Sequence, residues 1–306
     1  MASERLVIAT RQSELALWQA NFIAERLREA HPELTVELLG MTTQGDRWLS
    51  APLAQVGGKG LFIKELENAL TEGRADIAVH SVKDVPAQLP PGFAMPIVGF
   101  RDDVRDALVS TSGAGLFALP HRARIGSSSL RRQAQLLSAR PDLRVAPIRG
   151  NVQTRLRKLD AGEFDAVVLA AAGLHRLALD GRICEYLEME VCLPAAGQGA
   201  LGVECRAGDD RVQGLLAPLH DARTFAIVTA ERAVSGDLEA DCSAPLAAHA
   251  TFQAGSIHLR ALLAAADGSR VITASGRGDD PHQVGAAVAA SLRAQGAVAL
   301  LGEQGA

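Results

Sequence analysis

The N-terminal third of the chain alternates short apolar runs with amphipathic segments, a pattern that predicts strands and helices in turn. The predicted elements are strands at Arg5–Ala9, Thr35–Met41 and Asp76–His80, and helices at Glu14–Ala30 and Leu61–Leu70. Ser13 precedes the first helix and has the right chemistry to cap it. Strands and helices in alternation favour a mainly parallel sheet flanked by helices.

The same alternation returns in the middle of the chain. It predicts strands at Ala107–Ser110, Arg124–Ile125, Val145–Ile148 and Ala166–Ala170, and helices at Leu130–Ala139 and Val152–Leu159. Each of these strands runs into a turn that carries polar or basic residues. Ligands of open α/β sheets gather at the carboxyl ends of the strands, so we expect a binding site at these turns.

After about residue 218 the pattern changes to alternating strands joined by hairpin signals. A helix at Ala222–Val234 is predicted to precede strands at Ala247–Phe252, Ile257–Ala264 and Arg270–Ser275 and a last helix at Gln283–Gln295. The predicted fold class is α/β, with two α/β domains and a small α+β third domain built on a three-stranded antiparallel sheet. The predicted domains are 1–99 with 200–217, 100–199 and 218–306.

Basic residues gather in one stretch of this acidic chain. Residues 122–158 hold ten Arg or Lys and one acid, Asp142, although the net charge of the chain is −4. Such a cluster indicates a local anionic ligand, because a general binder of polyanions would be basic overall. Nucleic acid is the rival partner, but only 4% of the residues are aromatic and few bases could stack on them. We therefore expect a small anionic ligand and no nucleic acid.

The chain shows no sign of a membrane or secretory segment. No apolar run approaches the roughly 20 residues that a membrane span needs, and no long apolar segment begins the chain. The four cysteines form no CxxC pair, so the reducing cytoplasm fits best. We interpret Cys184, Cys192 and Cys205 as small buried apolar residues. Cys242 differs, because it lies in a turn between helix and sheet.

The segment Gly126-Ser-Ser-Ser-Leu-Arg-Arg132 places hydroxylic residues directly before a predicted helix. The free N–H groups of a helix N-terminus readily bind anions. Arg131 and Arg132 fall in the first turn, where cations oppose the helix dipole, which indicates that a ligand supplies the missing negative charge. A capped helix with solvated arginines is the alternative.

Further cations follow the next strands. Arg149 and Asn151 come directly after one predicted strand, Arg155 lies one helical turn beyond Asn151, and Arg176 follows a third strand. Successive parallel strands therefore deliver several cations to one edge of the predicted sheet.

The segment His80-Ser-Val-Lys-Asp-Val-Pro86 also follows a predicted strand. Opposite a basic wall, the carboxylate of Asp84 could stabilise a cationic intermediate or carry protons, whereas a loop ion pair with a neighbouring lysine is the plainer interpretation. We expect His80 to be buried or at a hinge rather than catalytic. Cys242 has no partner histidine and no set of metal ligands beside it, so we expect no metal site.

Several motifs in order resemble the porphobilinogen deaminase family, also called the hydroxymethylbilane synthases, from end to end. The matching segments are Ala9-Thr-Arg-Gln-Ser13, Gly57-Gly-Lys-Gly-Leu-Phe62, His80-Ser-Val-Lys-Asp-Val-Pro86, Gly126-Ser-Ser-Ser-Leu-Arg-Arg132, Arg149-Gly-Asn-Val-Gln-Thr-Arg155, Leu193-Pro-Ala-Ala-Gly-Gln-Gly199 and Glu231-Arg-Ala233.

The resemblance implies an enzyme of tetrapyrrole (haem) biosynthesis. Such an enzyme joins four porphobilinogen molecules head to tail into hydroxymethylbilane with loss of ammonia, on a dipyrromethane cofactor bound by a thioether to Cys242. It implies two domains like those of periplasmic binding proteins around a cleft, plus the third domain. It also implies a cytoplasmic monomer whose partner is a small molecule, with no membrane and no nucleic acid.

The resemblance also implies roles for individual residues. Asp84 would be the catalytic carboxylate that stabilises the azafulvenium cation left by ammonia, and a loop at Thr42–Gly60 with Lys59 would act as a lid. The residues implied to bind the cofactor are Lys83, Asp84, Ser129, Arg131, Arg132, Gly150 and Cys242. Those implied to bind the substrate are Arg11, Ser13, Arg149, Arg155, Arg176 and Gln198.

The residues around Cys242 depart from the family pattern. The family usually has two glycines before this cysteine, whereas this chain has Ala240 and Asp241. A carboxylate beside the thiol should raise its pKa and slow attachment of a cofactor. A family member that has lost the capacity for its cofactor through the change to Asp241 is therefore one alternative. A solute-binding module for polycarboxylates, which would use the same two-lobed cleft without turnover, is the other.

Overall fold

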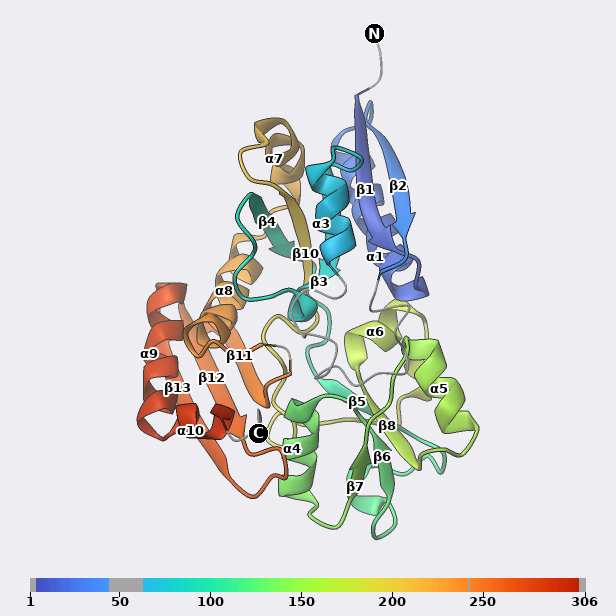
Figure 1. Ribbon diagram of the computed structural model, residues 1–306, viewed down its shortest axis with the longest axis vertical. Coiled ribbons are helices and arrows are strands. Elements are labelled where there is room, and N and C mark those ends of the chain that lie inside the picture. The colour runs from blue at the N-terminus through green and yellow to red at the C-terminus, as the bar shows by residue number, and fades with distance from the viewer. Residues whose placement is uncertain (1–3, 44–62, 242, 303–306) are drawn as a thin grey trace. The chain divides into compact units, whose positions relative to one another are not determined.

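The computed structural model describes residues 4–43, 63–241 and 243–302. The chain divides into two compact units, and each is described by itself (Figure 1). Unit 1 comprises Met1–Arg101 and Ala200–Phe225, and unit 2 comprises Asp102–Gly199 and Ala226–Ala306. The division into three domains stays a prediction. Within the described ranges, no helix is long and apolar enough to cross a membrane.

Unit 1 is built on a five-stranded sheet with the order β2-β1-β3-β10-β4. Its strands are β1 (Arg5–Arg11), β2 (Thr35–Met41), β3 (Ile77–Ser81), β4 (Phe93–Gly99) and β10 (Leu201–Arg206). Its helices are α1 (Glu14–Ala30), α3 (Lys64–Thr71) and α7 (Asp210–Leu216), with short 3-10 helices η2 (Val82–Asp84) and η5 (Ala217–Leu219). Strand β10 runs opposite to the other four.

Two helices cover opposite faces of this sheet. Ile8 of β1 packs with Ile23 of α1 in one apolar core. Val7 and Ala9 of the same strand pack with Leu66 of α3 in another core. Neighbouring side chains of a strand point to opposite faces, so the apolar run of β1 must be covered on both sides.

Unit 2 contains a second five-stranded sheet with the order β7-β6-β8-β5-β9. Its strands are β5 (Asp106–Ser110), β6 (Arg124–Gly126), β7 (Arg144–Ala146), β8 (Ala166–Ala170) and β9 (Glu185–Tyr186). Its helices are α4 (Leu130–Ala139), α5 (Val152–Asp160) and α6 (Ala171–Arg176), with η3 (Leu116–Ala118) and η4 (Asp180–Arg182). Leu108 packs with Leu136 of α4 on one face, and Val109 packs with Leu156 of α5 on the other.

Unit 2 also contains the predicted antiparallel sheet, with the order β11-β12-β13. Its strands are β11 (Leu246–Gln253), β12 (Ser256–Ala264) and β13 (Val271–Gly278), and its helices are α8 (Ala222–Asp237, which belongs to unit 2 from Ala226 on), α9 (Pro281–Ala294) and α10 (Ala297–Gly302). Leu259 packs with Val234 of α8 and Val288 of α9 in one core, so the helices cover one face, as Figure 1 shows for α9.

Most predicted elements are confirmed. The elements that were not predicted include strands β4 and β9, which pair with β10 and β5, and helices α6, α7 and α10. The sheets are mixed rather than purely parallel, since β5 and β10 each run against their neighbours. The start of the helix predicted at Leu61–Leu70 lies outside the described residues.

Gly268, in the turn between β12 and β13, provides a test of how closely this hairpin packs on α4. Its φ is +74°, and an added Cβ would lie 2.6 Å from both the Ala134 carbonyl oxygen and the Ser138 nitrogen. We expect Gly268→Ala to lower the free energy of unfolding by roughly 2–4 kcal/mol, because backbone strain and overpacking add. Denaturant titration measures this loss.

Gly113→Ala is the matched control. Its φ is +75°, but nothing lies within 4 Å of an added Cβ. This variant should lose only the backbone contribution, about 1–2 kcal/mol. Equal losses in the two variants would contradict the close approach of the hairpin to α4.

Candidate active site

In unit 1, the turn after β3 presents Asp84 to solvent on a firmly held backbone. Val82 and Val85 are buried on either side of it, whereas the Asp84 side chain is exposed. The Val82 nitrogen donates to the Ala200 carbonyl oxygen at 3.1 Å, which fixes η2 to the start of β10. Gly202 lies so close that an added Cβ would be 3.1 Å from Cγ2 of Val82.

Two buried polar contacts hold the strand that leads into this turn. His80 Nε2 lies 2.8 Å from Oε2 of Glu204, and both side chains are buried. Gln19 of α1 donates from Nε2 to the Ser81 hydroxyl oxygen at 2.8 Å. His80 is therefore a buried histidine, as we predicted, and it supports the segment that carries Asp84.

Arg11 and Ser13 lie at the same edge of the sheet as this turn. Strands β1 and β3 are adjacent and parallel, so their carboxyl ends share one edge. Arg11 is the last residue of β1, and Ser13 caps α1 by accepting a hydrogen bond from the Ala16 nitrogen at 3.4 Å. Two of the segments predicted to form the site are thus brought together within unit 1.

In unit 2, the turn after β6 leads into α4, whose first turn carries Arg131 and Arg132. Ser129 is the N-cap of this helix and accepts a hydrogen bond from the Arg132 nitrogen at 3.4 Å. The side chains of Arg131 and Arg132 are only 4% and 7% exposed. Both arginines therefore point into the protein, which excludes the alternative of solvated side chains.

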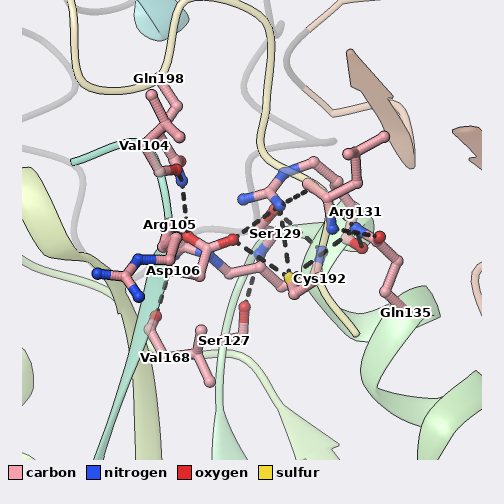
Figure 2. Close-up of polar contacts among 12 residues, drawn as sticks. Val104, Arg105, Asp106, Ser127, Ser129, Arg131, Gln135, Val168, Cys192 and Gln198 are labelled. Carbon is pink, nitrogen blue, oxygen red and sulfur yellow. Dashed lines mark hydrogen bonds and ion pairs between the residues drawn. The ribbon is translucent and has the colours of Figure 1, made fainter. Parts of the chain in front are cut away.

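The partner of both guanidinium groups is a buried carboxylate, Asp106, at the start of β5. Arg132 donates from Nε and Nη2 to Oδ1 at 3.0 and 2.7 Å, and Arg131 Nη1 lies 2.8 Å from Oδ2. Gln198 donates from Nε2 to Oδ1 at 3.0 Å (Figure 2). Burial alone would raise the pKa of Asp106, but the two guanidinium groups outweigh it and hold the pKa well below its usual range.

Cys192 belongs to the same cluster, as Figure 2 shows. Its Sγ lies 3.2 Å from Oδ2 of Asp106, and Arg131 Nη1 lies 3.5 Å from the sulfur. Burial, and the nearby Asp106 carboxylate after it, raise the pKa of the thiol to about 12. Cys192 is therefore buried in an apolar core, as predicted, and its thiol, which stays neutral at physiological pH, also contacts Asp106. Cys205 is buried as well, whereas Cys184 is only half-buried, contrary to the prediction.

These contacts correct the electrostatic argument made from the sequence. The missing negative charge at the start of α4 comes first from Asp106 within the chain, not from a ligand alone. Two guanidinium groups share this one carboxylate, so the cluster keeps one net positive charge. A buried net charge is unfavourable unless an anion compensates it, so the cluster still favours an anionic ligand.

The other predicted cations of unit 2 lie at the same sheet edge. Strands β7, β6 and β8 are parallel neighbours, so the turns and helices that follow them begin at one edge. Arg176 ends α6, is 7% exposed, and donates from Nη2 to the Gly199 carbonyl oxygen at 2.6 Å. Burial lowers the pKa of Arg176, although the Asp102 carboxylate opposes this shift.

The turn after β7 is shaped by Gly150. Its φ is +113°, and an added Cβ would lie 2.5 Å from the Thr154 side chain, so this turn requires glycine. Arg155 donates from Nε to the Gly150 carbonyl oxygen at 2.8 Å, and Arg149 is half-buried beside it. The turn therefore holds both arginines near the start of α5.

Two of the predicted site residues, Lys59 and Cys242, lie outside the described residues. Of the predicted lid at Thr42–Gly60, only Thr42 and Thr43 are described.

Next to Cys242, Asp241 Oδ1 accepts hydrogen bonds from the Ser243 nitrogen at 2.9 Å and from its hydroxyl at 2.5 Å. A surface depression beside this turn is lined by acidic groups, among them Glu239, and by Arg293.

The described residues include no group of three or more His, Cys, Asp or Glu that could hold a metal ion.

Two buried carboxylates, Asp106 and Glu231, were not predicted from the sequence to be functional residues. Glu231 is fully buried and accepts hydrogen bonds from the Gly197 and Ala250 nitrogens at 2.7 Å each. It therefore joins α8 to both the segment that carries Gln198 and strand β11. The family resemblance included Glu231 without giving it a role, and no local pattern singled out Asp106.

Comparison with known families gives two matches that together span most of the chain. Residues 6–214 match the family model described as porphobilinogen deaminase, dipyromethane cofactor binding domain. Residues 225–294 match the model of the porphobilinogen deaminase C-terminal domain.

Relatives match over nearly the whole chain. A porphobilinogen deaminase of Thiobacillus denitrificans is 55% identical over 298 residues, which cover 97% of this chain and 97% of the relative. A porphobilinogen deaminase of Syntrophotalea carbinolica is 52% identical over 303 residues, which cover 98% of this chain and 96% of the relative. Among solved structures, a TRAP periplasmic solute binding protein from Desulfovibrio salexigens aligns over 72% of this chain and 73% of its own, with 12% identity and a TM-score of 0.41.

The raised pKa of Cys192 predicts a specific pH dependence of stability. The thiol has a pKa of about 8.5 in an unfolded chain and about 12 in the folded protein. Its contribution to stability is therefore complete below pH ~8.5 and is lost as the pH rises towards the folded pKa. Between pH ~9 and ~11, the unfolding free energy of the native protein should therefore fall relative to that of Cys192→Ala. The difference between the two should shrink by about 1.4 kcal/mol per pH unit.

Denaturant titrations of both proteins across this pH range measure the difference. The pKa of the Cys205 thiol is also raised by burial, to about 11, but it titrates in both proteins and cancels in the comparison. Parallel pH profiles for the two proteins would contradict a neutral, buried Cys192.

Proposed function

This chain belongs to the porphobilinogen deaminase family, and we propose that it joins four porphobilinogen molecules head to tail into hydroxymethylbilane with release of ammonia. The observation that carries this proposal is the buried cluster of Arg131, Arg132 and Asp106, which keeps one net positive charge. Every pyrrole of this substrate bears two carboxylates, so a growing product accumulates negative charge that such a cluster can compensate.

The residues present fit a dipyrromethane cofactor, whose two pyrroles carry carboxylates. Buried guanidinium groups at the start of α4 supply the cationic partners, and the Ser129 hydroxyl and Gly150 lie at the same edge of the sheet. Cys242 would bind the group covalently. When bound, the cofactor would supply the primer to which the growing pyrrole chain is tethered.

Further arginines would bind the side-arm carboxylates of the substrate. Arg176 is buried with its pKa lowered by burial, so compensation by an incoming carboxylate would restore its usual range. The other groups proposed to bind the substrate are Arg11, Ser13, Arg149, Arg155 and Gln198. Lys59 would contribute a cation from the lid.

Asp84 would act as the catalytic carboxylate, with Lys83 beside it as a donor to ligand carboxylates. Asp84 is exposed at the end of η2, while the backbone beneath it is held by Val82 and by the buried pair of His80 and Glu204. A fixed carboxylate can stabilise the positive charge that develops when ammonia leaves the substrate and can accept a pyrrole proton.

The remaining expectations concern the state of the protein. We propose that it works in the cytoplasm as a monomer, which is supported by the absence of disulfide-like cysteine spacing in the sequence and by the family resemblance. Asp241 lies directly before Cys242 and accepts a hydrogen bond from the Ser243 nitrogen, and we expect its carboxylate to slow cofactor attachment without preventing it.

Attachment of the cofactor predicts a change in mass. The intact mass of the purified protein should exceed the mass of its sequence by one dipyrromethane unit, and the increment should be absent from Cys242→Ser. Cys184→Ser is the control, since this half-buried thiol should leave the increment in place. A native protein without the increment would favour a family member that has lost the capacity for its cofactor.

Catalysis by Asp84 predicts a loss of turnover without a loss of folding. Asp84→Asn should lower ammonia release from porphobilinogen by about 100-fold or more, because the neutral amide can neither compensate the developing cation nor accept a proton. The melting temperature should stay unchanged, because the side chain is exposed.

Asp160→Asn is the control for this variant. Asp160 forms an exposed ion pair with Arg182, and such pairs contribute little to stability. Its ammonia release should match that of the native protein. A native protein that binds porphobilinogen but releases no ammonia would instead support a solute-binding module.

A further inference from the structure

Two adjacent arginines in the first turn of α4 converge on one carboxylate, that of Asp106. Consecutive residues of a helix do not face the same direction, and two guanidinium groups repel each other. Arg131 and Arg132 nevertheless meet at one carboxylate, with Arg131 on Oδ2 and Arg132 on Oδ1. A shared acceptor is what allows both side chains to stay together in a buried position.

Further contacts fix the orientation of each guanidinium group. Arg132 donates from Nη1 to the Val168 carbonyl oxygen at 3.0 Å, and Arg131 donates from Nη1 to the Leu193 carbonyl oxygen at 2.7 Å. Gln135 accepts from the Leu193 nitrogen at 2.7 Å (Figure 2 shows Gln135 next to Arg131). Removing Asp106 would leave the two guanidinium groups with backbone acceptors and, for Arg131, the weakly accepting Cys192 sulfur, and it would leave two like charges together.

The cluster of Asp106, Arg131, Arg132 and Cys192 also determines the net charge of the site. Cys192 stays neutral because burial raises the pKa of its thiol to about 12, and the amide of Gln198 carries no charge. One carboxylate and two guanidinium groups then leave one positive charge. Without Asp106 the charge would double, and a buried pair of uncompensated cations would separate or admit water.

We propose that Asp106 is a positioning residue that holds Arg131 and Arg132 in the orientation that binds a ligand carboxylate and limits their combined charge to one. The consequence for the ligand rests on the proposed function, in which these arginines bind the dipyrromethane cofactor. The orientation of the arginines is a property of the protein alone and can be measured without the cofactor.

The first measurement addresses orientation. In ¹⁵N NMR spectra of the full-length native protein, the Nε–H group of Arg132 should exchange slowly with water, because it is buried on Oδ1 of Asp106. In Asp106→Asn this protection should be lost. The neutral amide offers one acceptor oxygen instead of two, and it compensates the charge of neither guanidinium group. A protected Arg132 signal that persists in the variant would overturn the proposal.

The second measurement addresses the consequence for the cofactor. Full-length protein produced in cells that cannot make porphobilinogen is incubated with porphobilinogen, and the gain of mass is followed with time. Asp106→Asn should load roughly 10–100-fold more slowly, the range seen when the groups that orient metal-binding side chains are removed. A folded variant that loads at the native rate would overturn the proposal.

Asp142→Asn is the matched control. Asp142 pairs with Arg140 in the same unit through contacts of 2.7 and 2.8 Å, but it is not part of the Asp106 cluster. This variant should load at the native rate, whereas equally slow loading would assign the effect of Asp106→Asn to general destabilisation and overturn the proposal.

The native protein decides the matter if Asp106→Asn does not fold. An Arg132 Nε–H group that exchanges much more slowly than that of the exposed Arg182 supports the proposal, and equally fast exchange of the two groups overturns it. If the native protein itself gains no mass, the proposed function fails, while the NMR measurement still decides whether Asp106 positions the arginines.

Discussion

One carboxylate shared by two consecutive arginines is the interaction on which the site of unit 2 depends. Asp106 is fully buried and joins the first turn of α4 to β5. Breaking a buried ion pair leaves an uncompensated charge and typically destabilises a protein by about 3–5 kcal/mol, so the two guanidinium groups cannot reorient freely. The same contact that fixes α4 on the sheet therefore also fixes the cations that meet a ligand.

A second buried carboxylate connects this cluster to the antiparallel sheet of unit 2. Glu231 of α8 accepts from the backbone nitrogens of Gly197 and Ala250, and the next residue after Gly197 is Gln198, which donates to Asp106. Neither nitrogen could reach water at these buried positions, so each needs the carboxylate as its acceptor. The segment between β9 and β10 is thus held from both sides by side chains that are distant in sequence.

Elements with a strong local pattern were predictable, whereas contacts between distant residues were not. Ser13 and Ser129 were recognised before amphipathic segments, and both cap helices as expected. The sequence also placed Arg131 and Arg132 together, because they are adjacent. Asp106 escaped notice, since its partners lie 25 and 26 positions away and its own surroundings in the sequence resemble an ordinary strand start.

The same limit explains why the electrostatic argument from the sequence was incomplete. The helix dipole correctly indicated that two cations at the start of α4 require negative charge, but it cannot tell an internal carboxylate from a ligand. The burial of Arg131 and Arg132 distinguishes the internal carboxylate from the ligand. The arginines are nearly inaccessible and already share Asp106, so an external anion has to compensate one charge rather than two. A site with a single residual charge can hold a carboxylate firmly while remaining stable before the ligand arrives.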